Sequence, residues 1–463
     1  MQDDMGIVLT ELEAALGTRG ILTGPDACAG YAADQSGLVL GTPGVVLRPA
    51  DTAETSVAVK ICAAHGLPII PQGGRTGLSG GGCALPGSVV LNCERMTGIE
   101  EIDLGAMTMT VHAGTPLQVV QEAAREQGLD YPVDIGARGS ATIGGTIATN
   151  AGGVRVLRHG MTRQNVLGLE AVLPDGSIMC RLGKTIKDNS GLDLKQLFIG
   201  SEGIFGIITR AVLQLRPMTP GYSTALLGLR NHEAALKCLA LARSHFKDAL
   251  AAFEGMWPDY WDHVCQHGLA RSPFHERHGF YLLIEAACDQ PQDTVQMEGF
   301  FEAAHEAGLV QDGVLAQSLA EAQALWQIRE VVGEVDASFG PHVNFDIGIA
   351  PSQLGGFCDA VDQSLKDLPF PASTLKVGHI GDGNVHLLVA CADRDEAKAR
   401  IETMVYDLLR GYSGTITAEH GIGRVKAPWL TYCRTPVEIA LMQRFKESLD
   451  PKLIMNPGAL IFK

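Results

Sequence analysis

The chain contains the stretch Lys376-Val-Gly-His-Ile-Gly-Asp-Gly-Asn-Val-His386, in which two histidines lie seven residues apart. Gly381 and Gly383 disfavour a helix at this place. In one continuous strand, the odd separation would point the two histidines to opposite faces. A strand, a tight turn and a second strand would instead let both imidazoles converge. The stretch therefore predicts a hairpin that brings His379 and His386 together.

A third candidate ligand follows later in the chain, in Ala418-Glu-His-Gly421. Two imidazoles and the carboxylate of Glu419 suit a divalent metal that keeps positions open for a substrate. The alternative is that both histidines only flank a turn and make structural hydrogen bonds. The spacing alone leaves these two interpretations open.

Length, composition and charge restrict the classes of function. The chain has 463 residues, enough for two or three domains, and 46% of them are hydrophobic, as in a globular protein. The net charge of −16 disfavours nucleic acid and anionic membranes as partners. The acidic start shows no signal peptide, and no apolar run is long enough for a membrane span. Eleven cysteines without a Cys-x-x-Cys motif favour reduced thiols and a cytoplasmic location.

Glycine clusters in two segments that are rich in small residues, Pro71–Gly82 and Asp134–Gly153. Such segments let backbone N–H groups turn toward one point and bind an anion, so two of them suit a pyrophosphate beside a flat ring system. The alternative is that these glycines serve tight loops and close packing. No Gly-x-Gly-x-x-Gly occurs, and Gly183-Lys-Thr185 lacks the glycine that a P-loop requires at Ile178, so neither common nucleotide-binding fold is predicted.

Hydrophobic periodicity and turn residues predict a first region that mixes strands and helices. Strands are expected at 45–47, 67–70, 89–92, 107–112 and 211–215, a hairpin at 169–178, and helices at 5–16, 52–65 and 116–127. The sequence Pro217-Met-Thr-Pro220 indicates a domain boundary. Strands and helices alternate beyond it, with helices at 319–335 and about 394–410, which predicts a second α/β unit with one helix-covered sheet.

Five motifs, in order, resemble those of the vanillyl-alcohol-oxidase-type flavoproteins. Within that family they are most similar to the FAD-linked D-2-hydroxy-acid dehydrogenases of the D-2-hydroxyglutarate and D-lactate branches. The motifs are Pro71-Gln-Gly-Gly-x-Thr-Gly77, Ile143-Gly-Gly-x-Ile-Ala-Thr-Asn-Ala-Gly-Gly153, Asp193-Leu-Lys-Gln-Leu-Phe-Ile-Gly-Ser-Glu-Gly203, Gly378-His-x-Gly-Asp-Gly-Asn-x-His386 and Ala418-Glu-His-Gly-Ile-Gly423.

The resemblance covers about Val45 to Gly458 and implies an α+β fold. It implies a PCMH-type FAD-binding domain of two subdomains at residues 1–218, which includes the N-terminal helical segment. An α/β substrate or cap domain is expected at 219–415, with one helix-covered sheet, and a C-terminal segment at 416–463 that returns to the flavin.

The resemblance also implies which residues bind FAD. The pyrophosphate cradle corresponds to Gly73, Gly74, Arg75, Thr76 and Gly77, and the second cofactor segment to Gly139, Ser140, Thr142, Gly144, Gly145, Asn150 and Gly152. Glu202, Gly206 and Ile207 correspond to the family's adenine-side segment, and Asn456 to its C-terminal asparagine near the flavin. Gly203-Ile-Phe-Gly206 departs slightly from the usual Gly-Thr-Leu-Gly. The first loop has no histidine, so FAD is expected to be bound without a covalent bond.

The resemblance favours the metal interpretation, with His379, His386 and Glu419 as ligands and zinc as the expected ion. His420 is the candidate general base, since an ordinary imidazole pKa of about 6.5 suits that task. Glu419 and His420 are adjacent, and the glycines that follow allow the irregular backbone by which one reaches the metal and the other the substrate. Arg329 matches the family's arginine for the substrate carboxylate, a role that its bidentate fork fits.

The substrate's far end is where this chain departs from its relatives. Dehydrogenases of this family that act on D-2-hydroxyglutarate carry a threonine, a lysine and an asparagine where this chain has Gly333, Asn344 and Leu388. A monocarboxylic D-2-hydroxy acid such as D-lactate is therefore expected ahead of D-2-hydroxyglutarate. The alternative is that Arg75 or Lys376 supplies the missing positive charge.

Two further alternatives remain open at this point: an oxidase that passes electrons to oxygen, and a non-catalytic flavin-binding subunit of a larger oxidoreductase. For a dehydrogenase the expected partners are the small 2-hydroxy acid and an electron acceptor, either an electron-transfer flavoprotein or a quinone-linked protein. A homodimer is an assembly that the sequence leaves open.

Overall fold

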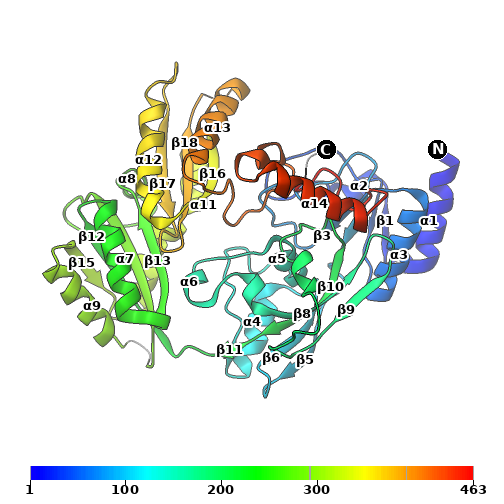
Figure 1. Ribbon diagram of the computed structural model, residues 1–463, viewed down its shortest axis with the longest axis horizontal. Coiled ribbons are helices and arrows are strands. Elements are labelled where there is room, and N and C mark those ends of the chain that lie inside the picture. Colours follow the sequence, from blue (N-terminus) through cyan, green and yellow to red (C-terminus); the bar gives the residue numbers. More distant parts are fainter. Residues whose placement is uncertain (1, 291–292, 393, 462–463) are drawn as a thin grey trace. The chain divides into compact units, whose positions relative to one another are not determined.

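The computed structural model describes residues 2–290, 293–392 and 394–461, and the chain divides into two compact units (Figure 1). Unit 1 contains residues 1–153, 160–218 and 419–463, and unit 2 contains residues 154–159 and 219–418. Within the described ranges, no helix combines the length and the apolar character that crossing a membrane requires.

The first sheet of unit 1 has four strands in the order β1-β2-β4-β3, of which β2, β4 and β3 run parallel. Their bounds are β1 Ile21–Thr23, β2 Val45–Leu47, β3 Ile69–Gln72 and β4 Val89–Asn92. The helices α1 (Gln2–Leu16) and α3 (Thr52–His65) pack on each other and contribute to the core of this sheet. Asp51 caps the start of α3, and Gly66 ends it in the left-handed conformation that favours glycine.

The second sheet of unit 1 is antiparallel, with strand order β5-β6-β10-β8-β9. These strands are β5 Ile99–Asp103, β6 Thr108–His112, β8 Val166–Val172, β9 Ile178–Arg181 and β10 Ile207–Gln214, and a two-stranded ribbon joins β7 Leu129–Asp130 to β11 Arg216–Pro217. The helices α4 (Leu117–Glu126) and α5 (Ile143–Thr149) bury apolar residues in the same core. Ala459 and Ile461 from the chain's last residues complete it.

Unit 2 is built on one sheet of seven antiparallel strands, in the order β15-β12-β14-β13-β17-β18-β16. The strands are β12 Gly221–Leu229, β13 Leu250–Met256, β14 Phe280–Cys288, β15 Val310–Leu315, β16 His342–Gly348, β17 Ser373–Gly378 and β18 Asn384–Ala390. This arrangement confirms the prediction of a single helix-covered sheet.

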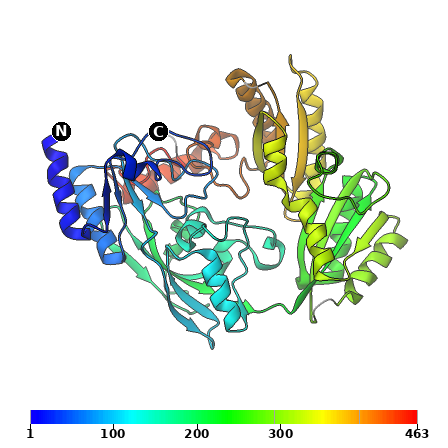
Figure 2. The same cartoon turned by 180° about the vertical axis from the view of Figure 1, so that it is seen from behind.

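Helices cover both faces of this sheet (Figures 1 and 2). One face packs on α8 (Pro258–Gln266), α10 (Leu319–Glu330) and α11 (Val332–Ser338). The other face packs on α7 (His232–Phe246), α9 (Val295–Glu306), α12 (Pro351–Leu365) and α13 (Asp395–Arg410). The short helix α6 (Val156–His159) also belongs to unit 2 and lies against β13.

Some predicted elements need correction. The helix expected at 319–335 is broken into α10 and α11 at Val331, whose ψ of 28° departs from helical geometry. The strand expected at 67–70 begins two residues later, because its ladder starts at the pairing of Ile69 with Val89. The sequence patterns did not predict α8, β15 or the C-terminal helix α14 (Pro436–Leu449). The bounds predicted for α3 and β4 are confirmed.

A buried ion pair fixes the chain's end to unit 1. The ammonium group of Lys446 in α14 donates to Asp450 Oδ2 at 2.6 Å and to the carbonyl oxygens of Ile204 and Met455. Asp450 in turn accepts the backbone N–H groups of Ile454 and Met455. The segment after α14 therefore returns to β3, where Met455 forms a parallel bridge with Ile69.

The change Lys446→Met should destabilise unit 1 by about 3 kcal/mol, because it leaves the buried carboxylate of Asp450 without its cation. Urea unfolding followed by far-ultraviolet circular dichroism measures this loss. The control is Lys237→Met, which removes an exposed ion pair with Glu233 four residues away on α7 and should have a much smaller effect. Equal effects of the two changes would contradict the role given to Lys446.

Candidate active site

The predicted hairpin is present, and it brings the two histidines together. His379 follows the last residue of β17, and His386 is the third residue of β18. Their ring centroids are 5.6 Å apart and the rings are nearly perpendicular, with ligand nitrogens within 4.8 Å of each other. The turn requires glycine at Gly383, because φ there is +90° and a Cβ atom would lie 2.0 Å from the carbonyl oxygen of Ile349.

A buried carboxylate orients His379. Glu254 in β13 is 1% exposed, and its Oε1 lies 2.8 Å from His379 Nδ1. Its Oε2 accepts Arg329 Nε at 2.8 Å. Burial alone would raise the pKa of Glu254, but the positive charges of His379 and Arg329 outweigh that effect and lower it. Glu254 is placed to accept an Nδ1 proton of His379, and in the neutral form of that ring Nε2 would be the atom that binds a ligand.

A second buried carboxylate lies beside His386. Asp346 in β16 is the direct cross-strand partner of His386, and its Oδ1 is 4.0 Å from His386 Nδ1. Asn384 donates its amide Nδ2 to the same Oδ1 at 2.8 Å. Asp346 was not among the predicted site residues, nor was Glu254. A charged residue inside an apolar strand, as in Leu250-Ala-Ala-Phe-Glu-Gly-Met256, is the signal that could have identified Glu254.

Glu419 and His420 directly follow the last residues of unit 2. Asp346 Oδ2 accepts two hydrogen bonds, one from Thr417 Oγ1 at 2.9 Å and one from the backbone N–H of Ala418 at 3.0 Å. In unit 1, Glu419 Oε1 accepts the backbone N–H of Gly153 at 3.0 Å. Gly153 is the last residue of the second glycine-rich segment, so a candidate ligand touches the predicted cofactor region.

Arg329 projects from α10 toward Glu254 and His379 and is 6% exposed. Its Nε bonds Glu254, and its Nη2 lies 3.3 Å from His379 Nε2. The guanidinium group therefore borders the ring that the metal interpretation uses. This position is compatible with holding a substrate carboxylate beside a ligand bound at His379.

In unit 1 the two glycine-rich segments lie against each other. A Cβ atom on Gly73 would lie 2.3 Å from Thr142 Oγ1, and one on Gly74 would lie 1.8 Å from the carbonyl oxygen of Ser140. Thr142 also caps the start of α5 by accepting the N–H of Gly145. The glycines are thus required for close backbone approach, and the structure joins the two segments that the sequence predicted to share one cofactor.

The remaining predicted cofactor residues lie in loops and strand ends of unit 1. Gly77 approaches Asp34, Gly139 lies near Gln118 and Gly144 near Ala113, whereas Arg75 stacks over Tyr31 with its guanidinium carbon 4.7 Å from the ring centre. Asn150 accepts the N–H of Arg163, and Asn456 donates to the carbonyl oxygens of Gly81 and Glu202. Arg75, Asn150, Glu202 and Asn456 all have positive φ. Thr76 follows Arg75, Gly152 is buried before Gly153, and Gly206 precedes Ile207, the first residue of β10.

Three residues that the sequence analysis named for the substrate's far end lie in or beside the hairpin strands. Leu388 and Asn344 are cross-strand partners on the same sheet face as His386, and Leu388 packs in the core under α8 and α10. Asn344 donates to Asp336. Lys376 is 3% exposed and donates to both Asp259 and Asp362, whose charges outweigh burial and raise its pKa.

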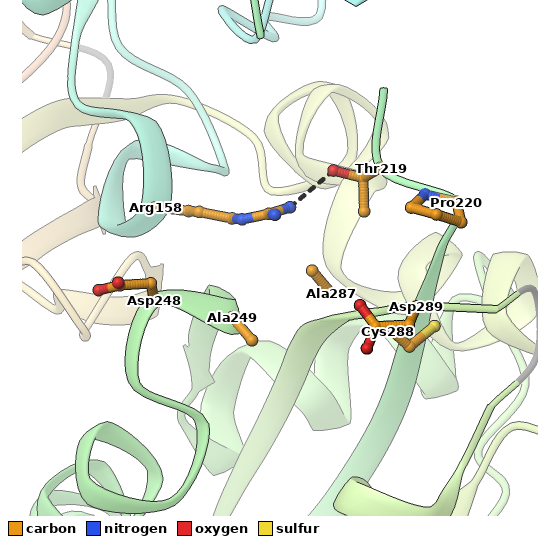
Figure 3. Close-up of a pocket in the computed structure, with 8 residues that line it drawn as sticks. All are labelled: Arg158, Thr219, Pro220, Asp248, Ala249, Ala287, Cys288 and Asp289. Atoms are coloured by element: carbon orange, nitrogen blue, oxygen red, sulfur yellow. Dashed lines mark hydrogen bonds between the residues drawn. The ribbon is translucent and has the colours of Figure 1, made fainter. Parts of the chain in front are cut away.

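A polar pocket in unit 2 contains none of the predicted site residues (Figure 3). Arg158 of α6 points into it and donates to Thr219 Oγ1 at 2.7 Å. Asp248 and Asp289 lie among its lining residues. This hydrogen bond ties α6 to Thr219, where the chain enters unit 2 for the second time.

Comparison with known proteins identifies the family. Residues 222–460 match the family described as FAD linked oxidases, C-terminal domain, and residues 43–180 match the family described as FAD binding domain. The chain is 39% identical over 461 residues to D-2-hydroxyglutarate dehydrogenase of Xanthomonas citri pv. viticola, covering 98% of this chain and 96% of that protein. It is 33% identical to D-2-hydroxyglutarate dehydrogenase of Stutzerimonas stutzeri, with 98% of each chain covered.

The solved structure of p-cresol methylhydroxylase with substrate bound has a similar fold. The TM-score is 0.76 at 15% identity, over 99% of this chain and 97% of that one. The α+β fold predicted from the motifs is confirmed, with an FAD-binding domain followed by the C-terminal domain of FAD-linked oxidases. The chain therefore belongs to the family of FAD-linked oxidases and, within it, to the FAD-linked D-2-hydroxy-acid dehydrogenases.

Proposed function

We propose that this dehydrogenase oxidises a monocarboxylic D-2-hydroxy acid to the 2-oxo acid, with a divalent metal held by His379, His386 and Glu419. The observation that carries the proposal is the pair of imidazoles at the ends of β17 and β18, each beside a buried carboxylate. When bound, FAD would supply the acceptor for the C2 hydrogen as hydride. As the partner that takes up these electrons we propose an electron-transfer flavoprotein or a quinone-linked protein.

The residues fit a metal by their chemistry. His379 gives its Nδ1 side to Glu254, which is the arrangement that fixes the tautomer of a metal-binding histidine. Two imidazoles and one carboxylate form a donor set that zinc uses in catalytic sites. When bound there, the metal would supply a Lewis acid that lowers the pKa of the substrate hydroxyl. Glu419 would be the third ligand; it directly follows Ala418, whose N–H is held by Asp346.

The change Glu254→Gln should weaken Zn²⁺ binding by about 10- to 100-fold, because a neutral amide no longer holds His379 in its orientation. Competition with a chelator measures the dissociation constant, and the FAD content should be unchanged. The matched control is Glu285→Gln, a buried glutamate of the same unit that bonds Arg155 and Trp326. Unchanged zinc affinity in Glu254→Gln, or no zinc binding by the unaltered protein, would refute the proposal.

For FAD we propose the two joined glycine-rich segments as the binding site, with no covalent bond to the protein. Their backbone N–H groups would face the pyrophosphate, since the glycines there leave room for close approach. Asn456 would bind on the flavin side, because its side chain already ties the C-terminal tail to Gly81 in the first segment. We also propose the domain limits expected from the sequence, with the substrate domain ending near residue 415.

For the proton step we propose His420 as the general base. It would take the hydroxyl proton while the hydride leaves C2, and an imidazole is well matched to this at neutral pH. Arg329 would hold the substrate carboxylate, because its guanidinium borders His379 and its orientation is fixed by Glu254. Glu419 and His420 are adjacent, and the left-handed φ of Gly421 and Gly423 supports an irregular backbone that separates their directions.

The change His420→Ala should lower the rate of flavin reduction by roughly two to four orders of magnitude, because the proton acceptor is lost. Stopped-flow absorbance of the flavin, mixed with saturating D-2-hydroxy acid, measures the rate, and FAD should remain bound. The control is His263→Ala on α8, a partly exposed histidine that bonds Ser338. A rate for His420→Ala within a few-fold of the unaltered enzyme would assign the base elsewhere.

The residues around the substrate's far end support an uncharged tail. Leu388 presents an apolar side chain on the face that carries His386, and its partner Asn344 is bonded to Asp336. Lys376, one of the two suggested substitutes, is already neutralised by Asp259 and Asp362. Burying the second carboxylate of a substrate without a partner would cost roughly several kcal/mol. D-2-hydroxyglutarate is the second candidate substrate, because the relatives named above bear that name.

The ratio of kcat/KM for D-2-hydroxyglutarate to that for D-lactate should lie below one. The change Asn344→Lys should raise this ratio by about tenfold or more, equal to about 1.4 kcal/mol, since it adds a cation beside Leu388. The control Gln363→Lys adds the same charge on α12 and should leave the ratio unchanged. A ratio well above about ten in the unaltered enzyme would establish D-2-hydroxyglutarate as the substrate instead.

A further inference from the structure

We infer that Glu202 positions His420 by holding the backbone that follows it, rather than by contacting FAD. This inference rests on the proposed role of His420 as base. It concerns only unit 1, which contains Glu202, the first glycine-rich segment and the chain from Glu419 onward. The resemblance placed Glu202 in the adenine-side segment of the cofactor site, and its carboxylate is bonded to the backbone of Ile422 and Gly423.

Both oxygens of the Glu202 carboxylate are used by one short segment. Oε1 accepts the backbone N–H of Ile422, and Oε2 accepts that of Gly423, each at 2.7 Å. Burial raises the pKa of the Glu202 carboxyl group, while the N–H groups of Ile422 and Gly423 act against that shift. Two hydrogen bonds accepted by one side chain fix an orientation as well as a distance. The segment two and three residues after His420 is therefore held by one side chain.

The fit between Glu202 and this segment leaves no room for a side chain at Gly421. A Cβ atom there would lie 2.9 Å from Glu202 Oε1, and φ at Gly421 is +80°. Gly423 is equally constrained, since its φ is +52° and a Cβ atom would lie 1.9 Å from the carbonyl oxygen of Ser79. The two glycines after His420 are thus required by close contact with these two residues.

Ser79, in the first glycine-rich segment, is a second residue that holds this backbone. Its Oγ lies 2.9 Å from the carbonyl oxygen of His420 and 2.8 Å from that of Gly421, and its single proton is shared between these two acceptors. Its own carbonyl oxygen accepts the N–H groups of Arg424 and Val425. The side chain of Ser79 is buried, so this contact does not compete with water. The backbone of His420 is therefore held directly, and not only through its neighbours.

The backbone of Glu202 is itself in an unfavourable conformation. Its φ is +52°, a region that residues other than glycine rarely adopt. Asn456 donates its amide to the carbonyl oxygen of Glu202, which helps to hold this conformation. A strained residue whose side chain points at a catalytic segment is typical of functional positioning.

The change Glu202→Gln tests the inference because glutamine keeps the shape but replaces one acceptor oxygen with an NH₂ group that faces a backbone donor. The limiting rate of flavin reduction should fall by about 10- to 100-fold, since a small displacement of a catalytic group has effects of that size. FAD content should stay at one per chain. Glu202→Asp, which keeps two carboxyl oxygens, should recover part of the rate.

The control for burial and charge is Glu170→Gln in the same unit, whose carboxylate bonds Thr52, Thr209 and Arg210 away from this segment. It should reduce flavin at the rate of the unaltered enzyme. Ser79→Ala offers a second test should Glu202→Gln fail to fold, and it should slow flavin reduction with FAD still bound.

The decisive comparison combines each change with His420→Ala. If Glu202 acts through His420, Glu202→Gln should have little further effect once the imidazole is absent. The same fold loss in both backgrounds would overturn the inference, as would loss of FAD from Glu202→Gln with a normal rate after FAD is restored. If Glu202→Gln has a normal rate while His420→Ala is slow, the inference about Glu202 is overturned but His420 remains the proposed base. If His420→Ala has a normal rate, the proposed base itself is overturned.

Discussion

The arrangement of the candidate site depends on one buried carboxylate, that of Asp346. It is 1% exposed, and it accepts hydrogen bonds from Asn384 in β18 and from Thr417 and Ala418 at the end of unit 2. One side chain thus links β16, the strand that carries His386, and the chain that continues into Glu419. A buried charge persists only where such donors compensate for its desolvation, and the same bonds hold β18 and the end of unit 2 against β16.

At Glu254, as at Asp346, neighbouring groups compensate for the cost of burying a carboxylate. Removing a carboxylate from water is costly, yet Arg329 and His379 hold its pKa below the ordinary value. Replacing this group by an apolar residue would relieve the desolvation cost but remove the carboxylate that pairs with the buried Arg329. The charged cluster is therefore better explained by orientation of His379 and Arg329 than by stability. Lys376 with Asp259 and Asp362 forms a separate charged cluster in the same unit.

Local sequence signals predicted the parts of the structure that local physics decides. The bounds of α3 follow from Asp51 at its start and Gly66 at its end, and the hairpin follows from the glycines between His379 and His386. The break between α10 and α11 and the pairing of β3 depend on contacts with distant segments, which periodicity does not contain. Glu254 and Asp346 were missed for the same reason, because each lies far in sequence from the histidine it faces.

The candidate base and ligand lie on a segment that is held on both sides. Ala418 is bonded to Asp346 on one side, Ile422 is bonded to Glu202 on the other, and only Glu419, His420 and Gly421 lie between them. Within unit 1, the carboxylate of Glu202 holds the backbone just after His420, and glycine at 421 allows a conformation that a larger residue could not adopt. Neither the Ala-Glu-His-Gly motif nor its spacing reveals this contact, because Glu202 lies more than 200 residues earlier in the chain.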